Sequence, residues 1–248
     1  MHVSITPEIV FYLGGMPITN TLITAVSVSL ILIVVGHFAA RKLKKVPGAL
    51  SVQNVFEMII EALLSMIDGV TGDRKLSYKF FPLVATLFIF ILLSNWLGLL
   101  PGMGSFGFFE TAGENHHQVF SPIFRSAASD LNVTLALAIV SVLATQIFGI
   151  AILGFLKYGK KFINFSSPIK LFVGLLEIIS EIAKMISFSF RLFGNVFAGE
   201  VLLVVIMTLV PFIAPLPFFA LELFVGFIQA LVFAMLTLVF LKTAVMAH

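Results

Sequence analysis

The chain has 248 residues, of which 60% are hydrophobic and only 11% are charged, and its net charge is +3. A soluble globular domain carries about 25% charged residues, so this composition excludes that class. The mean hydropathy is +1.13, and several continuous apolar runs exceed the roughly 20 residues that cross a bilayer. The runs do not alternate as the strands of a transmembrane barrel do. We therefore expect an all-α polytopic membrane protein. The absence of cysteine excludes disulfides and thiolate metal sites.

The apolar runs predict a single membrane domain over residues 1–248, with about five membrane-embedded helices. We expect spans at 17–40, 82–100 and 131–156, followed by two further helices at 168–210 and 217–242. Residues 48–72 interleave acidic and apolar side chains, with Glu57 and Glu61 on one helical face. This pattern is typical of an amphipathic helix at the membrane interface. Residues 102–130 are rich in Gly, Pro and polar residues and are expected to form a loop.

The basic residues predict the orientation of these spans. Eleven of the 15 Lys and Arg residues fall in two connecting regions, 41–79 and 157–170, and only Arg125 falls in the 102–130 loop. By the positive-inside rule, the two basic regions are cytoplasmic and the loop is outside. The N-terminus is then outside and the C-terminus cytoplasmic. The N-terminal residues lack the basic region of a signal peptide, so the first span is expected to direct insertion.

The run from about Pro168 to Pro211 is too long for a simple span. As a helix it would be about 64 Å long at 1.5 Å per residue, whereas the hydrocarbon core is about 30 Å thick. No proline interrupts it. Either the helix lies far from the membrane normal, or its first turns run along the surface.

Arg191 lies deep inside this run, where a cation costs about 2.5–3.5 kcal/mol to insert. On a helical wheel, five of six polar residues of the run fall within about 80° of arc. The six are Glu177, Glu181, Lys184, Ser187, Arg191 and Asn195. Glu200 falls well off this stripe. In the last predicted helix, Glu222 and Gln229 are seven residues apart and share a face.

This arrangement favours proton conduction. A continuous polar path across a bilayer would leak, whereas two half-paths on different faces, separated by a fixed cation, would not. Arginine suits the role of separator because it stays protonated, whereas a buried lysine could lose its proton.

Residues Ser187 to Glu200 resemble the a subunit of F-type ATP synthases. The resemblance rests on the core 191–195 (Arg-Leu-Phe-Gly-Asn), followed by 198–200 (Ala-Gly-Glu). Residues 95–102, 130–138, 229–230 and 236–241 also match, in the same order. The resemblance covers roughly residues 20–243.

The resemblance implies a non-catalytic stator subunit beside a rotating ring of c subunits, each with a carboxylate in the membrane. It also implies the b subunits of the peripheral stalk as partners, a bilayer environment and H⁺ as the transported ion. Nucleic acid, cofactors and metals are not expected. A bacterial inner membrane is favoured over a mitochondrial one, and the two C-terminal helices are expected to form a long, strongly tilted hairpin. The choice between H⁺ and Na⁺ stays open.

The resemblance also implies roles for single residues. Arg191 separates the two half-channels, and the other expected path residues are Asn195, Glu200, Glu222, Gln229, Glu177, Ser187 and Asn95. Glu177 and Ser187 match positions of the cytoplasmic half-channel, and Asn95 matches one on the outer side. Glu200 and Glu222 match an outer pair that is commonly one Glu and one His. Two nearby carboxyls would titrate as a coupled pair, and they could relay a proton or divide into one relay and one structural group.

Other interpretations of these residues stay open. Glu181 and Lys184 could form an i, i+3 ion pair on an interfacial face, and Asn95 could simply bond a neighbouring helix. A secondary transporter would show internal repeats, and none relates the two halves of the chain. A quinone-binding subunit or membrane enzyme would call for histidine ligands or paired catalytic acids, but His37 is the one histidine clearly inside a span. The adjacent His116 and His117 lack a further ligand and are expected to be solvated.

Overall fold

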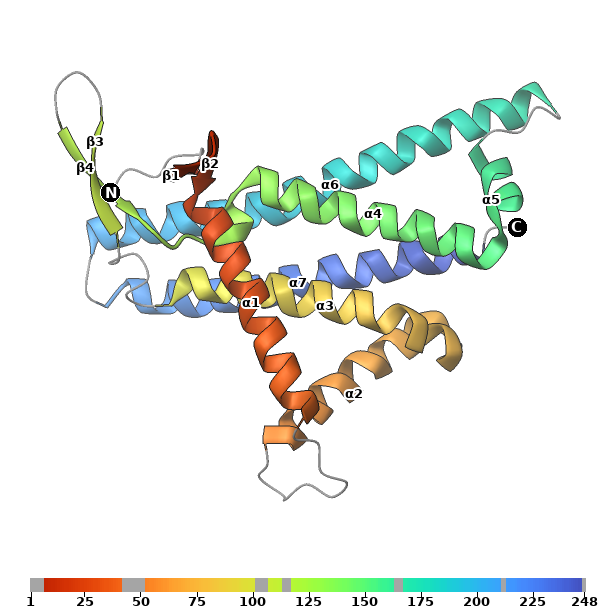
Figure 1. The fold of residues 1–248 in the computed structure, drawn as a ribbon, viewed down its shortest axis with the longest axis horizontal. Helices are drawn as coiled ribbons and strands as arrows, with labels where there is room; N and C mark the ends of the chain where they lie inside the picture. The colour runs from red at the N-terminus through yellow and green to blue at the C-terminus, as the bar shows by residue number, and fades with distance from the viewer. Residues whose placement is uncertain are drawn as a thin grey trace. The chain divides into compact units, whose positions relative to one another are not determined.

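The computed structural model describes residues 7–41, 52–100, 107–112, 117–162, 167–210 and 213–246. Helices dominate these residues (Figure 1). They are α1 (Asn20–Arg41), α2 (Val52–Thr71), α3 (Arg74–Leu99), α4 (Leu131–Leu153), α5 (Phe155–Phe162), α6 (Pro168–Leu209) and α7 (Pro215–Val245). Among the described residues, α1, α3, α4, α6 and α7 are long and apolar enough to cross a membrane. The predicted fold class, an all-α polytopic membrane protein, is confirmed.

Short strands accompany the helices. Strand β1 (Ile9–Leu13) pairs antiparallel with β2 (Met16–Thr19), and β3 (Gly107–Ala112) pairs antiparallel with β4 (His117–Pro122). The second hairpin and a 3₁₀ turn, η2 (Ala127–Ser129), fall inside the predicted 102–130 loop. Strands β3 and β4 contain Phe, Thr and Val, which favour extended backbone. Part of the predicted loop therefore forms a β-hairpin. Predicted positions 42–51, 101–106, His116 and 211–212 lie outside the described residues.

The chain divides into two compact units. Unit 1 comprises residues 1–41, 89–134 and 190–231, and unit 2 comprises 42–88, 135–189 and 232–248. Helices α3, α4, α6 and α7 supply residues to both units. The proposal of a single membrane domain over the whole chain stays a prediction.

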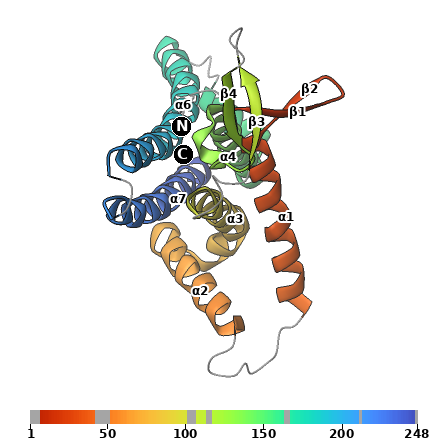
Figure 2. The same ribbon diagram turned by 90° about the vertical axis from the view of Figure 1, so that its left-hand side faces the viewer.

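In unit 1, hydrogen bonds tie the beginning of α1 to the segment before α4. Thr21 Oγ1 donates to Asp130 Oδ2 at 2.8 Å, and Asn20 Nδ2 donates to the Pro122 carbonyl at 3.2 Å. Asp130 also caps α4, since its Oδ1 accepts from the Asn132 backbone N–H at 2.8 Å. All of residues 126–130 are buried. Figure 2 shows the β1–β2 hairpin at the beginning of α1. These contacts hold the 126–130 segment in a fixed place inside unit 1.

In unit 2, α5 folds back from the end of α4. Gly154 joins the two helices with a φ of 85°, a left-handed conformation that glycine adopts without strain. The Tyr158 hydroxyl donates to Gln146 Oε1 at 2.6 Å, and its ring lies against Gly149. Burial, with a smaller contribution from the acidic Glu181 and Glu177, raises the pKa of Tyr158 to about 12. The phenol of Tyr158 is therefore neutral at physiological pH and anchors α5.

Two polar contacts connect other helices of unit 2. Ser141 of α4 and Thr237 of α7 share a buried hydroxyl–hydroxyl hydrogen bond of 2.8 Å. Lys242 Nζ donates to the Val70 carbonyl at 2.6 Å, close to the end of α2. A cation there also complements the negative end of the α2 dipole. The last turns of α7 are thus joined to both α4 and α2.

Candidate functional site

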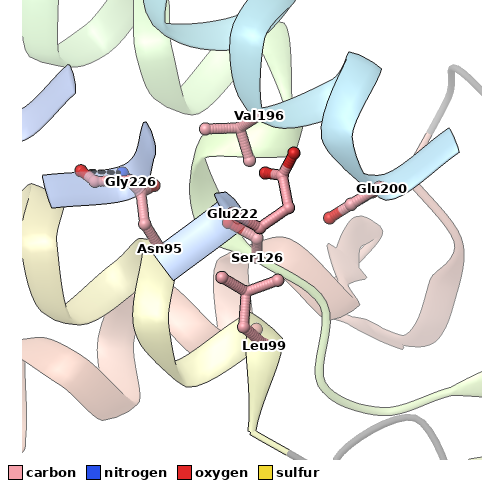
Figure 3. A pocket seen from close by; sticks show the side chains of 8 residues that line it. Asn95, Leu99, Ser126, Val196, Glu200, Glu222 and Gly226 are labelled. Carbon is pink, nitrogen blue, oxygen red and sulfur yellow. Dashed lines mark hydrogen bonds between the residues drawn. The ribbon is translucent and has the colours of Figure 1, made fainter. Parts of the chain in front are cut away.

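A small cavity lies inside unit 1, among α3, α6, α7 and the segment that follows β4 (Figure 3). Its volume is about 20 Å³, which is enough for one water molecule. It is lined by Asn95, Gly98, Leu99, Ser126, Val196, Glu200, Glu222 and Gly226. Three of the residues expected on the proton path, Asn95, Glu200 and Glu222, therefore line one cavity.

Glycines bring the helices around this cavity into close contact. A Cβ on Gly199 of α6 would overlap the Glu222 carboxyl of α7, so the missing side chain leaves the space that this carboxyl occupies. A Cβ on Gly98 of α3 would lie 2.6 Å from Ser126 Cβ and 2.8 Å from its backbone N and Cα. Glu222 is only 8% exposed. The absence of a side chain at Gly199 thus leaves room for the Glu222 carboxyl between α6 and α7.

Hydrogen bonds hold α3 against α7 beside the cavity. Asn95 Nδ2 donates to the Gly226 carbonyl at 3.2 Å, and Trp96 Nε1 donates to the Leu223 carbonyl at 3.0 Å. Asn95 therefore bonds a neighbouring helix, as one of the two interpretations from the sequence expected. Its other amide atom, Oδ1, is buried with no hydrogen-bond partner among the described residues. That atom remains available to accept a hydrogen bond, so the structural contact does not exclude a role on the path.

Glu200 lies in an ion pair that the sequence analysis did not predict. Arg125 Nε donates to Glu200 Oε2 at 3.0 Å, and Arg125 Nη2 lies 3.0 Å from the same oxygen. The two residues are 75 positions apart in the chain, so no helical periodicity connects them. The available signal was that Arg125 is the one basic residue of the 102–130 region.

Arg191 and Asn195 lie on the exposed face of α6 in unit 1. Gly194 and Ala198 share this exposed face, whereas Leu192 is buried toward the helices of the unit. Gln229 of α7 is half-buried. Neither Arg191 nor Asn195 nor Gln229 is among the lining residues of the cavity. The exposed face combines a cation with small residues, which would allow another helix to approach closely.

Glu177 and Ser187 belong to unit 2 and do not line the cavity. Lys161 of α5 pairs with Glu177 at 2.7 Å and lies 3.9 Å from Glu181, which also pairs with Lys184 at 2.8 Å. The i, i+3 ion pair considered from the sequence is therefore present. Ser187 is exposed on α6. Lys161 was not predicted in this cluster, because it lies on α5, a separate short helix.

Comparisons with known proteins identify the family. The family described as "ATP synthase A chain" matches residues 21–242. "ATP synthase subunit a" of Campylobacter jejuni is 39% identical over 220 residues, which cover 88% of this chain and 86% of that protein. The protein of the same name in Campylobacter fetus is 35% identical over 229 residues, covering 91% and 90%.

A relative from another lineage matches over a longer range. "ATP synthase subunit a" of Moorella thermoacetica is 33% identical over 245 residues, which cover 98% of this chain and 99% of that protein. The family match reaches into all five candidate membrane helices. The chain therefore belongs to the ATP synthase A chain family, as its resemblance to the a subunit predicted.

Proposed function

We propose that the chain is the proton-conducting stator subunit of its ATP synthase, with two offset half-channels that Arg191 separates. Membership in the family makes it a multi-pass membrane subunit of the complex. A carboxylate on each c subunit takes a proton from one half-channel, passes around the ring and releases it into the other. The chain itself carries no catalytic site for ATP, and b subunits anchor it as part of the stator.

The observation that carries this proposal is the position of Arg191 on α6. The helix has 42 residues and is apolar enough to span a membrane, yet it presents a cation on an exposed face. Such a cation is costly in lipid and needs a polar or negatively charged surface opposite it. A carboxylate of a c subunit supplies that charge, and a guanidinium stays positive at every accessible pH. Arg191 can then displace the proton of an arriving carboxyl while blocking direct passage between the half-channels.

The cavity of unit 1 supports the outer half-channel. It joins Asn95, Glu200 and Glu222 around a space for one water, and such a water can carry a proton to or from a carboxyl of the cavity. In unit 2, Glu177 and Ser187 supply the polar groups of the cytoplasmic half-channel. Asn195 lies one turn beyond Arg191 on α6, and Gln229 matches a glutamine that the family places near its arginine; both complete the polar surface toward the ring.

The distribution of charge supports the orientation and location. The basic regions 41–79 and 157–170 face the cytoplasm, the N-terminus is outside and the C-terminus is cytoplasmic, as the positive-inside rule predicts. The similar proteins named above are bacterial, which favours a bacterial inner membrane. H⁺ is the proposed coupling ion.

Single cysteines test the two half-channels, because the chain contains no cysteine of its own. The matched pair is Ser126→Cys, in the cavity of unit 1, and Ser187→Cys, on the exposed face of α6 in unit 2. We expect Ag⁺, a thiol-reactive ion small enough to move along a path of single waters, to modify Ser126→Cys only from the outside and Ser187→Cys only from the cytoplasmic side. Each modification should block ATP-driven proton pumping, because it fills one half-channel.

The labelling is done on the assembled complex in right-side-out and inverted membrane vesicles. Val34→Cys, on an exposed apolar position of α1, is the control that should react from neither side. Reaction of both serine positions from the same side would contradict two half-channels that open on opposite sides.

A further inference from the structure

We infer that Arg125 is a positioning residue that holds Glu200 as a fixed ion pair, and that Glu222 is the carboxyl of the cavity that exchanges protons. This inference rests on the proposed function and assigns different roles to the two acids of the outer half-channel, Glu200 and Glu222. It decides between the two alternatives that the sequence leaves open, a relay through both acids or one relay and one structural acid.

The ion pair is concentrated on one oxygen of Glu200. Arg125 Nε and Nη2 each lie 3.0 Å from Glu200 Oε2. The Arg125 side chain is 11% exposed and the Glu200 side chain 21%. The contact from Nε is a charge-assisted hydrogen bond, and such bonds are about twice as strong as neutral ones. Protonation of Glu200 would therefore remove the charge attraction that this pair supplies.

The backbone that follows Arg125 is held in place by its packing in unit 1. Residues 126–130 are all at most 3% exposed. Ser126 lies directly against Gly98, and Asp130 accepts the hydroxyl hydrogen bond of Thr21. Arg125 thus extends from an anchored segment, and the pair with Glu200 is built into the packing of unit 1.

Glu222 has a different environment. Within the part of the chain that the structure describes, no Lys, Arg or His lies within ion-pair distance of its carboxyl. The carboxyl lies over Gly199 and lines the cavity, as does Asn95, whose Oδ1 accepts no protein hydrogen bond there. Figure 3 shows Glu222 and Asn95 among the side chains around this cavity, and a water in it can connect the two. Glu222 can gain and lose a proton without breaking an ion pair, whereas Glu200 cannot.

The test is a double-mutant cycle in the complete ATP synthase, measured as ATP-driven proton pumping in inverted membrane vesicles. Arg125→Gln and Glu200→Gln each leave one buried charge without its partner, and each should lower pumping by about tenfold or more. The double variant removes both charges, and we expect it to pump within about threefold of the wild type. Arg125→Lys keeps the charge and should pump better than Arg125→Gln. Glu222→Gln should abolish pumping.

Membrane-bound ATP hydrolysis and the amount of this chain in the membrane report assembly of each variant. If the single variants do not assemble, the double variant alone tests the inference. It leaves no unpaired charge from the Arg125–Glu200 pair, so the inference requires it both to assemble and to pump. A double variant that does not assemble, or that assembles and does not pump, would overturn the inference. Normal pumping by Glu222→Gln would overturn it as well. Neither result would change the sidedness of labelling at Ser126→Cys and Ser187→Cys, so failure of this inference is distinguishable from failure of the proposed function.

Discussion

Replacing Arg191 by Ala is expected to abolish ATP-driven proton pumping, while ATP hydrolysis by the complex continues. The cation is the barrier between the two half-channels, so its loss removes the charge that expels the proton from each arriving carboxyl. Without it, protons can also pass from one half-channel to the other without rotation of the ring. We expect at least about a hundredfold loss of coupled pumping, since removing a buried charge from its partner costs about 3–5 kcal/mol.

The measurement uses inverted vesicles with a fluorescent pH indicator, and hydrolysis is measured in the same samples. Lys170→Ala is the matched control, because Lys170 is an exposed cation at the beginning of the same helix and should pump normally. Arg191→Lys should not restore full pumping, because a lysine loses its proton more readily in an apolar environment. Pumping at the wild-type rate by Arg191→Ala would contradict the proposed role.

Gly98→Ala is expected to have the largest effect on stability among the glycine substitutions of unit 1. The added Cβ would lie 2.6–2.8 Å from Ser126 atoms that include backbone, and backbone cannot rotate away as a flexible side chain can. Overpacking of this kind costs about 1–3 kcal/mol. The shift would also move Ser126 and the adjacent Arg125, so proton pumping should fall together with stability.

The thermal stability of the purified complex and the amount of this chain in the membrane check this expectation. Gly36→Ala is the control, since Gly36 lies inside α1 with nothing within 4 Å of its added Cβ. Alanine is a better helix former than glycine, so this control should be as stable as the wild type or slightly more so. Equal stability of Gly98→Ala and Gly36→Ala would show that the α3–Ser126 contact is not tight.

The helical part of the fold could be predicted because membrane spans are determined by length and hydropathy alone. The predicted 168–210 helix appears as α6, Pro168–Leu209, since no proline interrupts the run. The same rule could not find β3 and β4 or helix α5. These elements depend on short-range turn geometry, such as the left-handed Gly154, which hydropathy does not record.

The candidate site could be predicted only where its residues share a helix or a family motif. Asn95, Glu200 and Glu222 were expected on the path, and the structure adds that they line one cavity. Arg125 could not be assigned to Glu200, because a pairing across 75 residues depends on how α6 packs against the segment before α4. Lys161 was missed for a similar reason, since the turn at Gly154 decides which residues of α6 it can reach.

The most direct test of the central claim is whether the Arg191 face of α6 lies against the carboxylates of the c ring. Asn195→Cys places a thiol one turn beyond Arg191 on the exposed face, and a second cysteine is introduced beside the carboxylate of the c subunit. Under mild oxidation of the assembled complex, we predict a disulfide between the two subunits that blocks pumping and is reversed by reduction. Val34→Cys on α1 should form none. Absence of the Asn195→Cys cross-link in a complex that pumps protons would contradict the placement of Arg191 opposite the ring.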